Sequence, residues 1–366
     1  MKSDQQKIDA DELVQLARLA IRGKRPDLIL YLRRLVKRYR LSFPYLADEL
    51  TSLVRQVPDA SSVLRGTVVD AIPVDQDTRL QLAKPEYPVE LETEPIWGDR
   101  LRADLEQIAM EREMELKLAD ADLHPTKSAL FVGPPGVGKT LAARWIANRL
   151  NRPLIILDLS AVMSSFLGRT GNNIRNVLDY AKGSNCVLLL DEFDAIAKRR
   201  DDAVEVGELK RLVTVLLQEI DQWPSTGLLL AATNHPDLLD PAVWRRFEVI
   251  VKFPMPSATE RRKAIDVFLG EDADERSWSD ILARAFSASS FADIRRDVLS
   301  AKRNAVVHGH SPLIPLQRMV KDRVRSLDRD SRTEIAVALL GQGLSQREAH
   351  EWTGVSRDTI RKAVPQ

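Results

Sequence analysis

The sequence is poor in cysteine, in long apolar runs and in net charge. Its 366 residues include one cysteine, Cys186, which excludes an intrachain disulfide and most cysteine-based metal sites. No apolar stretch approaches the length of about 18 residues that a membrane-spanning helix needs, and no secretory signal is visible. We therefore expect a soluble, cytoplasmic protein without membrane contact. The formal net charge of +1 excludes a global field that would draw the chain to nucleic acid.

Protease signatures are also missing. The chain contains neither H-E-x-x-H nor G-x-S-x-G, so any proteolysis linked to it would come from a separate protease or effector subunit. Positive charge gathers only at the two ends, because residues 1–57 and 301–366 each hold 12 Lys or Arg against 7 Asp or Glu. Such an excess favours a solvated helical surface over a surface that meets a partner.

The chain divides into pieces with different patterns, as expected for two or three domains. Four short apolar runs alternate with helical stretches, which predicts an α/β fold with a parallel sheet and flanking helices. The runs are Ala129–Val132, Leu154–Leu157, Val187–Leu190 and Gly227–Ala232. The predicted domains are a helical bundle (1–57), a linker with one or two short strands (58–95), the α/β part (96–255), an all-helical part (256–310), a connector (311–330) and a helix-turn-helix (331–366).

A glycine-rich loop follows the first apolar run, in the stretch LFVGPPGVGKT at residues 130–140. Glycines allow a tight turn and close approach to a ligand, and the N-terminus of the next helix attracts anions. This pattern, G-x-x-x-x-G-K-[ST], predicts a loop that cradles the phosphates of ATP, with Lys139 on the β- and γ-phosphates and the Thr140 hydroxyl on Mg²⁺. The residues predicted to bind nucleotide here are Gly133, Pro134, Pro135, Gly136, Val137, Gly138, Lys139, Thr140 and Leu141.

Two carboxylates follow the third apolar run. Asp191 and Glu192 come directly after Val187–Leu190, and ligands of parallel sheets bind at the carboxyl ends of strands. Asp191 is predicted to hold the Mg²⁺ shell, and Glu192 to activate a water as general base. Asp194, three residues on, fits a helix start.

With these two motifs, residues 95–310 resemble the AAA+ ATPases, and in particular the AAA subset that includes katanin, spastin and the membrane-anchored AAA proteases. The resemblance implies a P-loop AAA+ module with a helical lid. It rests further on GLLLAATNHPDLLDPAVWRRFEVIVKFPMPS. There Asn234 matches a sensor that orients the lytic water, and Arg245 with Arg246 match arginine fingers that reach a neighbouring subunit. A ring, commonly of six subunits, is thereby implied, because the site of one subunit is completed by the next.

The resemblance also implies a protein client. Phe166, Leu167 and Gly168 match a pore loop that grips an extended polypeptide, although the residues after Gly168 depart from the family pattern. A core position for Phe166 is the alternative. In the lid, Arg295 or Arg296 matches a sensor of bound nucleotide. Ile96 and Trp97 lie where relatives form an adenine pocket, and packing of Trp97 in the core is an equally good alternative.

The C-terminal stretch LLGQGLSQREAHEWTGVSRDTIRKAV at residues 339–364 predicts a helix-turn-helix similar to those of bacterial recombinases and regulators. Ser345 and Glu348 form a capping box, and Gly354 gives the turn. DNA-binding examples place the second helix in the major groove, where its exposed side chains contact the duplex. The possible DNA contacts are Arg357, Thr359, Arg361 and Lys362. Docking to a protein is the alternative use of this fold.

The sequence thus predicts an Mg²⁺-dependent ATP hydrolase that forms a ring and remodels or unfolds a protein by threading it through pore loops. A DNA-associated ATPase in transposition, replication or regulation, guided by residues 331–366, is the alternative. A third reading is a loading subunit that hydrolyses ATP only to control assembly.

Overall fold

The computed structural model describes residues 83–159, 170–197, 206–270 and 273–364, and scattered residues between 31 and 51. The chain forms two compact units, residues 1–70 and 71–366. Most of the predicted N-terminal bundle, and the predicted linker up to residue 82, lie outside the described residues. Those described between 31 and 51 are helical except Phe43.

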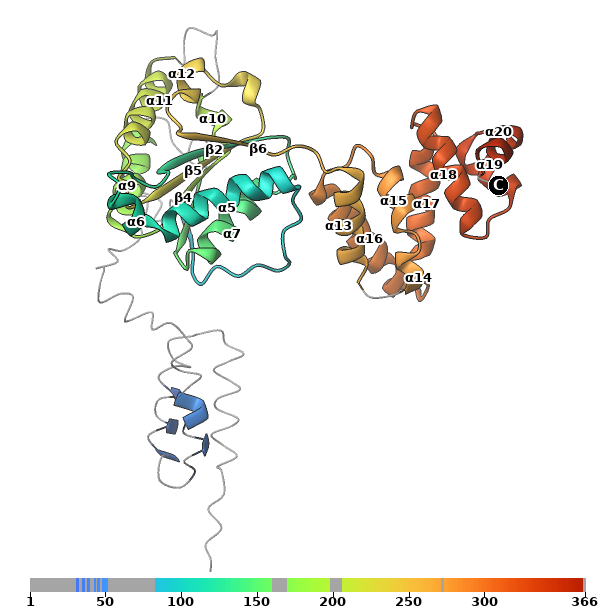
Figure 1. Cartoon of the computed structure of the whole chain (residues 1–366), viewed down its shortest axis with the longest axis horizontal. Coiled ribbons are helices and arrows are strands. Elements are labelled where there is room, and N and C mark those ends of the chain that lie inside the picture. Colours follow the sequence, from blue (N-terminus) through green and yellow to red (C-terminus); the bar gives the residue numbers. More distant parts are fainter. Residues whose placement is uncertain are drawn as a thin grey trace, which may run out of the picture. The chain divides into compact units, whose positions relative to one another are not determined.

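Six strands make the sheet of the second unit, in the spatial order β1-β3-β4-β5-β2-β6 (Figure 1). β1 is antiparallel to β3, and every other pairing is parallel. The strands are β1 (Lys84–Glu86), β2 (Ser128–Val132), β3 (Leu154–Asp158), β4 (Val187–Asp191), β5 (Leu228–Thr233) and β6 (Val249–Lys252). The four predicted strands are therefore confirmed as β2 to β5, and β6 joins them at the edge beside β2.

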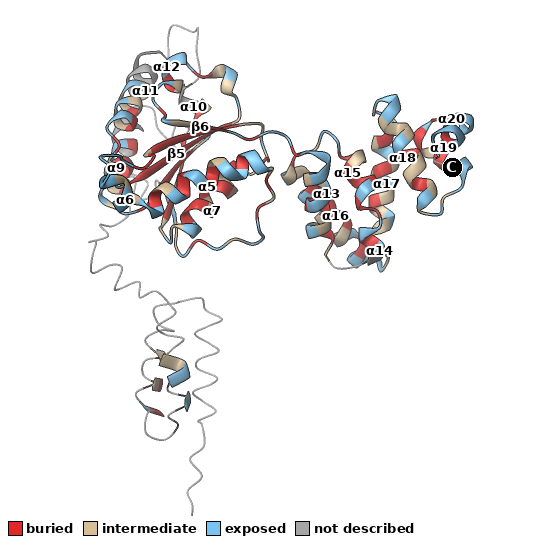
Figure 2. Ribbon diagram, in the orientation of Figure 1, coloured by how far each residue is buried: buried red, intermediate tan, exposed pale blue. Residues whose placement is uncertain are grey.

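Helices cover both faces of this sheet, which explains why its central strands read as unbroken apolar runs. One apolar cluster joins alternate strand residues to α9 (Thr170–Gly183) and α11 (Val206–Asp221), and the other joins the remaining strand residues to α5 (Asp99–Glu113) and α7 (Lys139–Arg149). Figure 2 shows the buried strands between these layers. The shorter elements are α6 (Glu115–Ala119), α10 (Asp194–Ala197), η1 (Pro236–Leu238) and α12 (Pro241–Trp244).

Every described element beyond β6 is a helix. Helices were predicted for residues 256–310 and 331–366, whereas residues 311–330, predicted as a connector, contain α17. The helices are α13 (Ala258–Leu269), α14 (Ala273–Arg276), α15 (Ser279–Ala285), α16 (Phe291–His308), α17 (Leu313–Val324), α18 (Arg329–Gly341), α19 (Gln346–Thr353) and α20 (Arg357–Ala363). A single apolar cluster runs from Ile265 on α13 through Phe286 and Val298 to Leu339 on α18 and Ile360 on α20. The predicted lid, connector and helix-turn-helix thus share one core, which we call the helical unit (residues 258–363).

The segment predicted as a linker packs against the sheet where it is described. β1 pairs with β3, and Val89 is buried while its carbonyl accepts a hydrogen bond from Asn148 Nδ2 at 2.6 Å. Arg144 on α7 forms a two-point ion pair with Glu86. Within the described part of the chain, no helix is both long enough and apolar enough to cross a membrane.

Candidate functional site

The glycine-rich loop, residues 133–138, connects β2, which lies between β5 and the edge strand β6, to the start of α7. Gly136 and Gly138 have φ values of 77° and 99°, which residues with a side chain rarely adopt. A Cβ at Gly133 would lie 2.1 Å from the carbonyl oxygen of Phe253, so only glycine lets the loop approach the end of β6. The predicted loop geometry therefore follows from its glycines.

Lys139, the first residue of α7, turns its amine back into this loop. Its Nζ donates to the carbonyl oxygens of Gly133 at 2.6 Å and Pro134 at 2.8 Å, and to Asn234 Oδ1 at 2.7 Å. Burial lowers the pKa of Lys139 to about 8, against the opposing pull of the Asp191 and Asp194 carboxylates. The loop thus holds a buried cation at its centre, as a phosphate site requires.

The acidic pair lies beside the loop at the carboxyl end of β4. Asp191 Oδ2 accepts a hydrogen bond of 3.0 Å from Thr140 Oγ1, so the two predicted metal ligands are in contact. Glu192 has a left-handed φ of 53° and an exposed side chain, and its backbone N–H donates to Asp191 Oδ1 at 2.9 Å. This turn directs the two adjacent carboxylates differently, one to the threonine and one to solvent.

Asn234 directly follows β5, the strand next to β4 in the sheet. Asp194 Oδ1 accepts hydrogen bonds from Thr233 Oγ1 at 2.8 Å and from the Asn234 backbone N–H at 3.1 Å. Sequence reasoning placed Asp194 only at a helix start, which is where α10 begins. Its contact with the residues around Asn234 was missed, because it depends on two strands lying side by side.

The residues present fit a nucleotide phosphate with Mg²⁺. Among the described residues, no protein acceptor bonds the backbone N–H groups of Gly136, Val137 and Gly138, so these donors remain for a ligand. No group of three or more His, Cys, Asp or Glu in the described chain forms a metal cage. A hydroxyl and one carboxylate, with oxygens from the ligand itself, are the donor set that Mg²⁺ uses beside phosphates.

The two predicted finger arginines differ in their surroundings. Both are exposed at the end of α12, which begins with Asp240 as its N-cap and Pro241 as its first residue. Arg246 forms an ion pair with Asp221 at the end of α11. Arg245 has no ion-pair partner within the described residues. Phe247 then packs edge-on against Phe193, with ring centroids 5.8 Å apart, and so ties this segment to the residue after Glu192.

The helical unit touches the loop directly. The backbone N–H of Ala292, in the first turn of α16, donates to the Gly136 carbonyl at 3.1 Å, and a Cβ at Gly136 would lie 2.4 Å from Ser290 Oγ. Ser290 and Asp293 form a capping box, whose hydrogen bonds lower the pKa of the Asp293 carboxyl. Because the first turn of α16 contacts Gly136, a movement of the loop must be accompanied by a movement of this turn.

Both lid arginines considered as nucleotide sensors are ion-paired. Arg295 contacts Glu92 at 2.6 Å, and Arg296 contacts Asp293 at 2.9 Å. Trp97, on the other side of the loop, is buried, and its Nε1 lies 3.9 Å from the position of a Cβ at Gly138. The predicted pore-loop residues Phe166, Leu167 and Gly168 lie outside the described residues.

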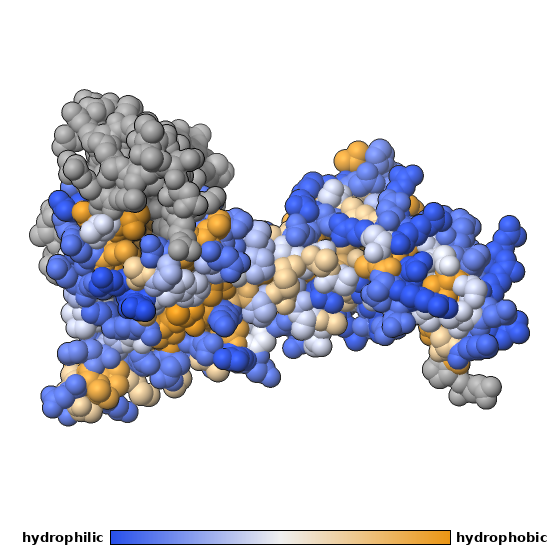
Figure 3. All heavy atoms as spheres, turned by 90° about the horizontal axis from the view of Figure 1, so that it is seen from above, coloured by the Kyte–Doolittle hydropathy of each residue, from blue (hydrophilic) through white to orange (hydrophobic). Residues whose placement is uncertain are grey.

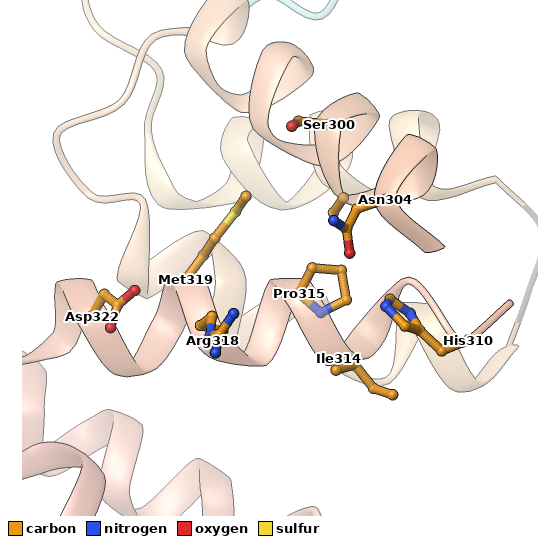
Figure 4. Close-up of a pocket in the computed structure, with 9 residues that line it drawn as sticks. Ser300, Asn304, His310, Ile314, Pro315, Arg318, Met319 and Asp322 are labelled. Carbon is orange, nitrogen blue, oxygen red and sulfur yellow. The ribbon is translucent and has the colours of Figure 1, made fainter. Parts of the chain in front are cut away.

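A separate hollow of about 530 Å³ lies between α16 and α17 (Figure 4). Its lining mixes apolar side chains with isolated polar ones, and it contains no residue of the loop or the acidic pair. The residues are Ser300, Ala301, Asn304, His310, Ile314, Pro315, Arg318, Met319 and Asp322. We therefore assign it no part in nucleotide chemistry.

A family match falls on the sheet and its loops, and individual relatives match between about a third and two thirds of the chain. Residues 129–255 match the family described as "ATPase family associated with various cellular activities (AAA)". An uncharacterized AAA family ATPase, y4kL, from Sinorhizobium fredii is 48% identical over 129 residues, which cover 35% of this chain and 39% of that protein. The glycine-rich loop, the acidic pair and Asn234 all lie inside the matched family segment.

Two archaeal relatives extend the similarity. A proteasome-activating nucleotidase from Methanocella arvoryzae is 31% identical over 257 residues, 65% of this chain and 60% of its own length. Proteasome-activating nucleotidase 1 from Haloferax volcanii is 29% identical over 276 residues, 68% of each chain. This chain thus spans 39% and 60% of the length of the first two relatives.

Proposed function

Because this chain carries an ATPase domain of the AAA family, we propose that it is an Mg²⁺-dependent ATP hydrolase that forms a ring and unfolds or remodels a protein client. ATP binds at the junction of two subunits, and six subunits close the ring. The similarity to proteins named as proteasome-activating nucleotidases supports a protein client and leaves room for a separate protease or effector subunit.

The residues around the loop account for the hydrolytic half of the proposal. Lys139 and the free N–H groups of the loop hold the β- and γ-phosphates, while Thr140 and Asp191 hold Mg²⁺. The metal neutralises charge that develops on the phosphoryl oxygens. Glu192, exposed beside Asp191, accepts the proton of the attacking water. Asn234 has its Oδ1 bonded to Lys139, so its amide N–H₂ is left to orient that water.

The proposal that subunits assemble into a ring is supported by one observation. Arg245 is exposed, and no acidic side chain among the described residues pairs with it. An exposed guanidinium that no acidic side chain holds is free to pair with the γ-phosphate of ATP bound to a neighbouring subunit, through a charge-assisted hydrogen bond. Arg246 is bound to Asp221, so it supports the position of Arg245 and contacts phosphate only after leaving that pair. A heterologous contact of this kind repeats until a ring closes.

Mixing two inactive variants tests the shared site. Lys139→Ala removes phosphate binding, and Arg245→Ala with Arg246→Ala removes the groups donated to the neighbour. Each variant alone should be inactive. A one-to-one mixture should regain about a quarter of the wild-type ATPase rate, because a quarter of the randomly formed junctions have both halves intact.

A second mixture is the matched control. Lys139→Ala and Glu192→Gln both damage the loop side of a junction, so no mixed junction can be complete and no activity should return. Recovery in this control, or none in the first mixture although size-exclusion chromatography shows mixed oligomers, would overturn the shared site.

A further inference from the structure

The pair α19–α20 at the end of the helical unit is held in a fixed geometry. Gly354 forms the turn with a left-handed φ of 68°, and the predicted capping box of Ser345 and Glu348 is present. Ser356 caps α20 by accepting from the backbone N–H of Thr359. Ile360 and Val355 are buried in the shared core, so α20 presents its opposite side to solvent.

Basic residues of neighbouring helices stabilise the end of α19. Arg325 donates to the carbonyl oxygen of Glu351 at 3.1 Å, and Arg332 donates to that of Thr353 at 3.4 Å. Lys321 forms an ion pair with the Glu351 carboxylate at 2.8 Å. These contacts satisfy carbonyl groups that a helix end otherwise leaves free, and they fix the direction in which α20 leaves the turn.

On α19 and α20, two acidic side chains have partners within the protein, whereas three basic side chains have no ion-pair partner in the described part of the chain. The Glu348 carboxylate is engaged in the cap, and the Glu351 carboxylate is paired with Lys321. Arg357, Arg361 and Lys362 are exposed and have no ion pair among the described residues. Asp358 is the acidic group that faces solvent on the same helix. The outward face of α20 is therefore positive after internal pairing. Figure 3 shows hydrophilic residues over much of the surface of the helical unit, with apolar patches between them.

We propose that this face binds double-stranded DNA, with α20 in the major groove. Arg357 and Arg361 are one helical turn apart, about 6 Å along the axis, which matches the rise of about two base pairs. Arginine at this spacing can contact guanine edges or phosphates, and Lys362 lies beside Arg361 to reach the backbone. Thr359, predicted as a fourth contact, is half-buried with its hydroxyl bonded to Ser356 at 2.8 Å, so it positions α20.

The composition of this face favours DNA over a protein or an RNA duplex. The exposed positions 357, 358, 361, 362 and 363 carry charged side chains and one alanine, whereas the centres of protein interfaces are depleted in charge and rich in aromatic residues. An RNA duplex has a major groove too deep and narrow for a helix to read. The proposal does not depend on the ring or on a protein client.

Fluorescence anisotropy with a labelled 30-base-pair DNA duplex and the full-length protein tests the proposal. The triple variant Arg357→Gln, Arg361→Gln, Lys362→Gln should bind at least about tenfold more weakly at moderate salt. Each lost phosphate contact should also flatten the slope of log K against log salt by about 0.9. The three changes together should reduce it by about 2 to 3.

The matched control removes three exposed charges elsewhere in the helical unit: Lys263→Gln, Arg303→Gln and Arg329→Gln. It should bind duplex DNA within about twofold of wild type, and both triple variants should keep the basal ATPase rate. The proposal is overturned if wild type does not bind the duplex at low salt, if both triple variants bind it equally, or if an RNA duplex competes equally well. Loss of a defined protein partner in the α20 variant, with duplex affinity unchanged, would make this face a protein-docking surface instead.

Discussion

Lys139 is a cation in a place that disfavours charge. Its side chain is buried, and its amine is bonded to two loop carbonyls and to Asn234. Since burial lowers its pKa from 10.5 to about 8, the folded protein binds fewer protons than the unfolded chain between pH 8 and 10.5. The contribution of this group to stability therefore rises with pH over that window and is least favourable below pH 8.

A pH-dependent nucleotide affinity follows. ATP needs the charged amine, so at pH 9 binding must be accompanied by uptake of a proton, whereas at pH 7 the amine is already charged. We expect proton uptake to rise from near zero at pH 7 to about one per site at pH 9, and the dissociation constant to rise with it. Calorimetry in buffers of different ionisation enthalpy measures this directly. Equal uptake at both pH values would contradict a lowered pKa.

At this scale the sequence pointed to residues that the structure brings together at the candidate site, and missed how they are held. Lys139, Thr140 and Asp191 follow from short motifs whose neighbours along the chain suffice. The contact of Asp194 with Thr233 and Asn234 joins residues 39 and 40 positions apart, and it exists only because the ends of β4 and β5 meet. No local pattern encodes such a contact.

At the scale of elements, burial decided what could be predicted. β2, β4 and β5 are buried along almost their whole length, and their apolar runs are unmistakable. β6 lies at the sheet edge with one fully buried residue, and its three β-branched residues form a shorter apolar run than those that predicted the other strands. β1 is three residues with a central proline, and its place comes from pairing with β3.

The shared core of the helical unit predicts the outcome of a truncation. Removing residues 329–366 would uncover the side of α15 that packs against α18, and would take Leu339 and Ile360 out of the shared apolar cluster. Each large apolar side chain lost from a core costs about 1.5 to 3 kcal/mol, and the whole fold is stabilised by only about 5 to 15 kcal/mol. We expect the truncated chain to melt at lower temperature and to lose ATPase activity.

Thermal unfolding followed by circular dichroism, beside an ATPase assay, checks this. The triple glutamine variant of α20 serves as control, because its changed side chains face solvent and leave the core intact. A truncated chain that unfolds at the wild-type temperature would show that α18–α20 form an independent domain.

At the scale of the whole molecule, the central channel of the proposed ring makes Phe166 the residue that tests threading. It lies outside the described residues, so its role rests on the sequence pattern alone. If it grips a polypeptide, Phe166→Ala should keep basal ATP turnover and lose stimulation by an unfolded protein such as casein. Phe166→Tyr keeps an aromatic side chain at this position, so it should retain both basal turnover and stimulation.

Two outcomes would count against threading. Stimulation by casein that is unchanged in Phe166→Ala would favour a subunit that uses ATP only to control assembly. Collapse of basal turnover together with a lower melting temperature in the same variant would place Phe166 in the domain core.

Trp97 and Trp145 meet edge-on, with ring centroids 5.3 Å apart, and the indole nitrogen of Trp97 lies next to Gly138. Indole emission depends on local polarity and on quenching by nearby groups. Any shift of the glycine turn as phosphate arrives therefore changes the colour or brightness of this pair. If the proposed ATPase cycle moves this turn, the change in indole emission allows its steps to be timed by stopped-flow fluorescence without an attached dye.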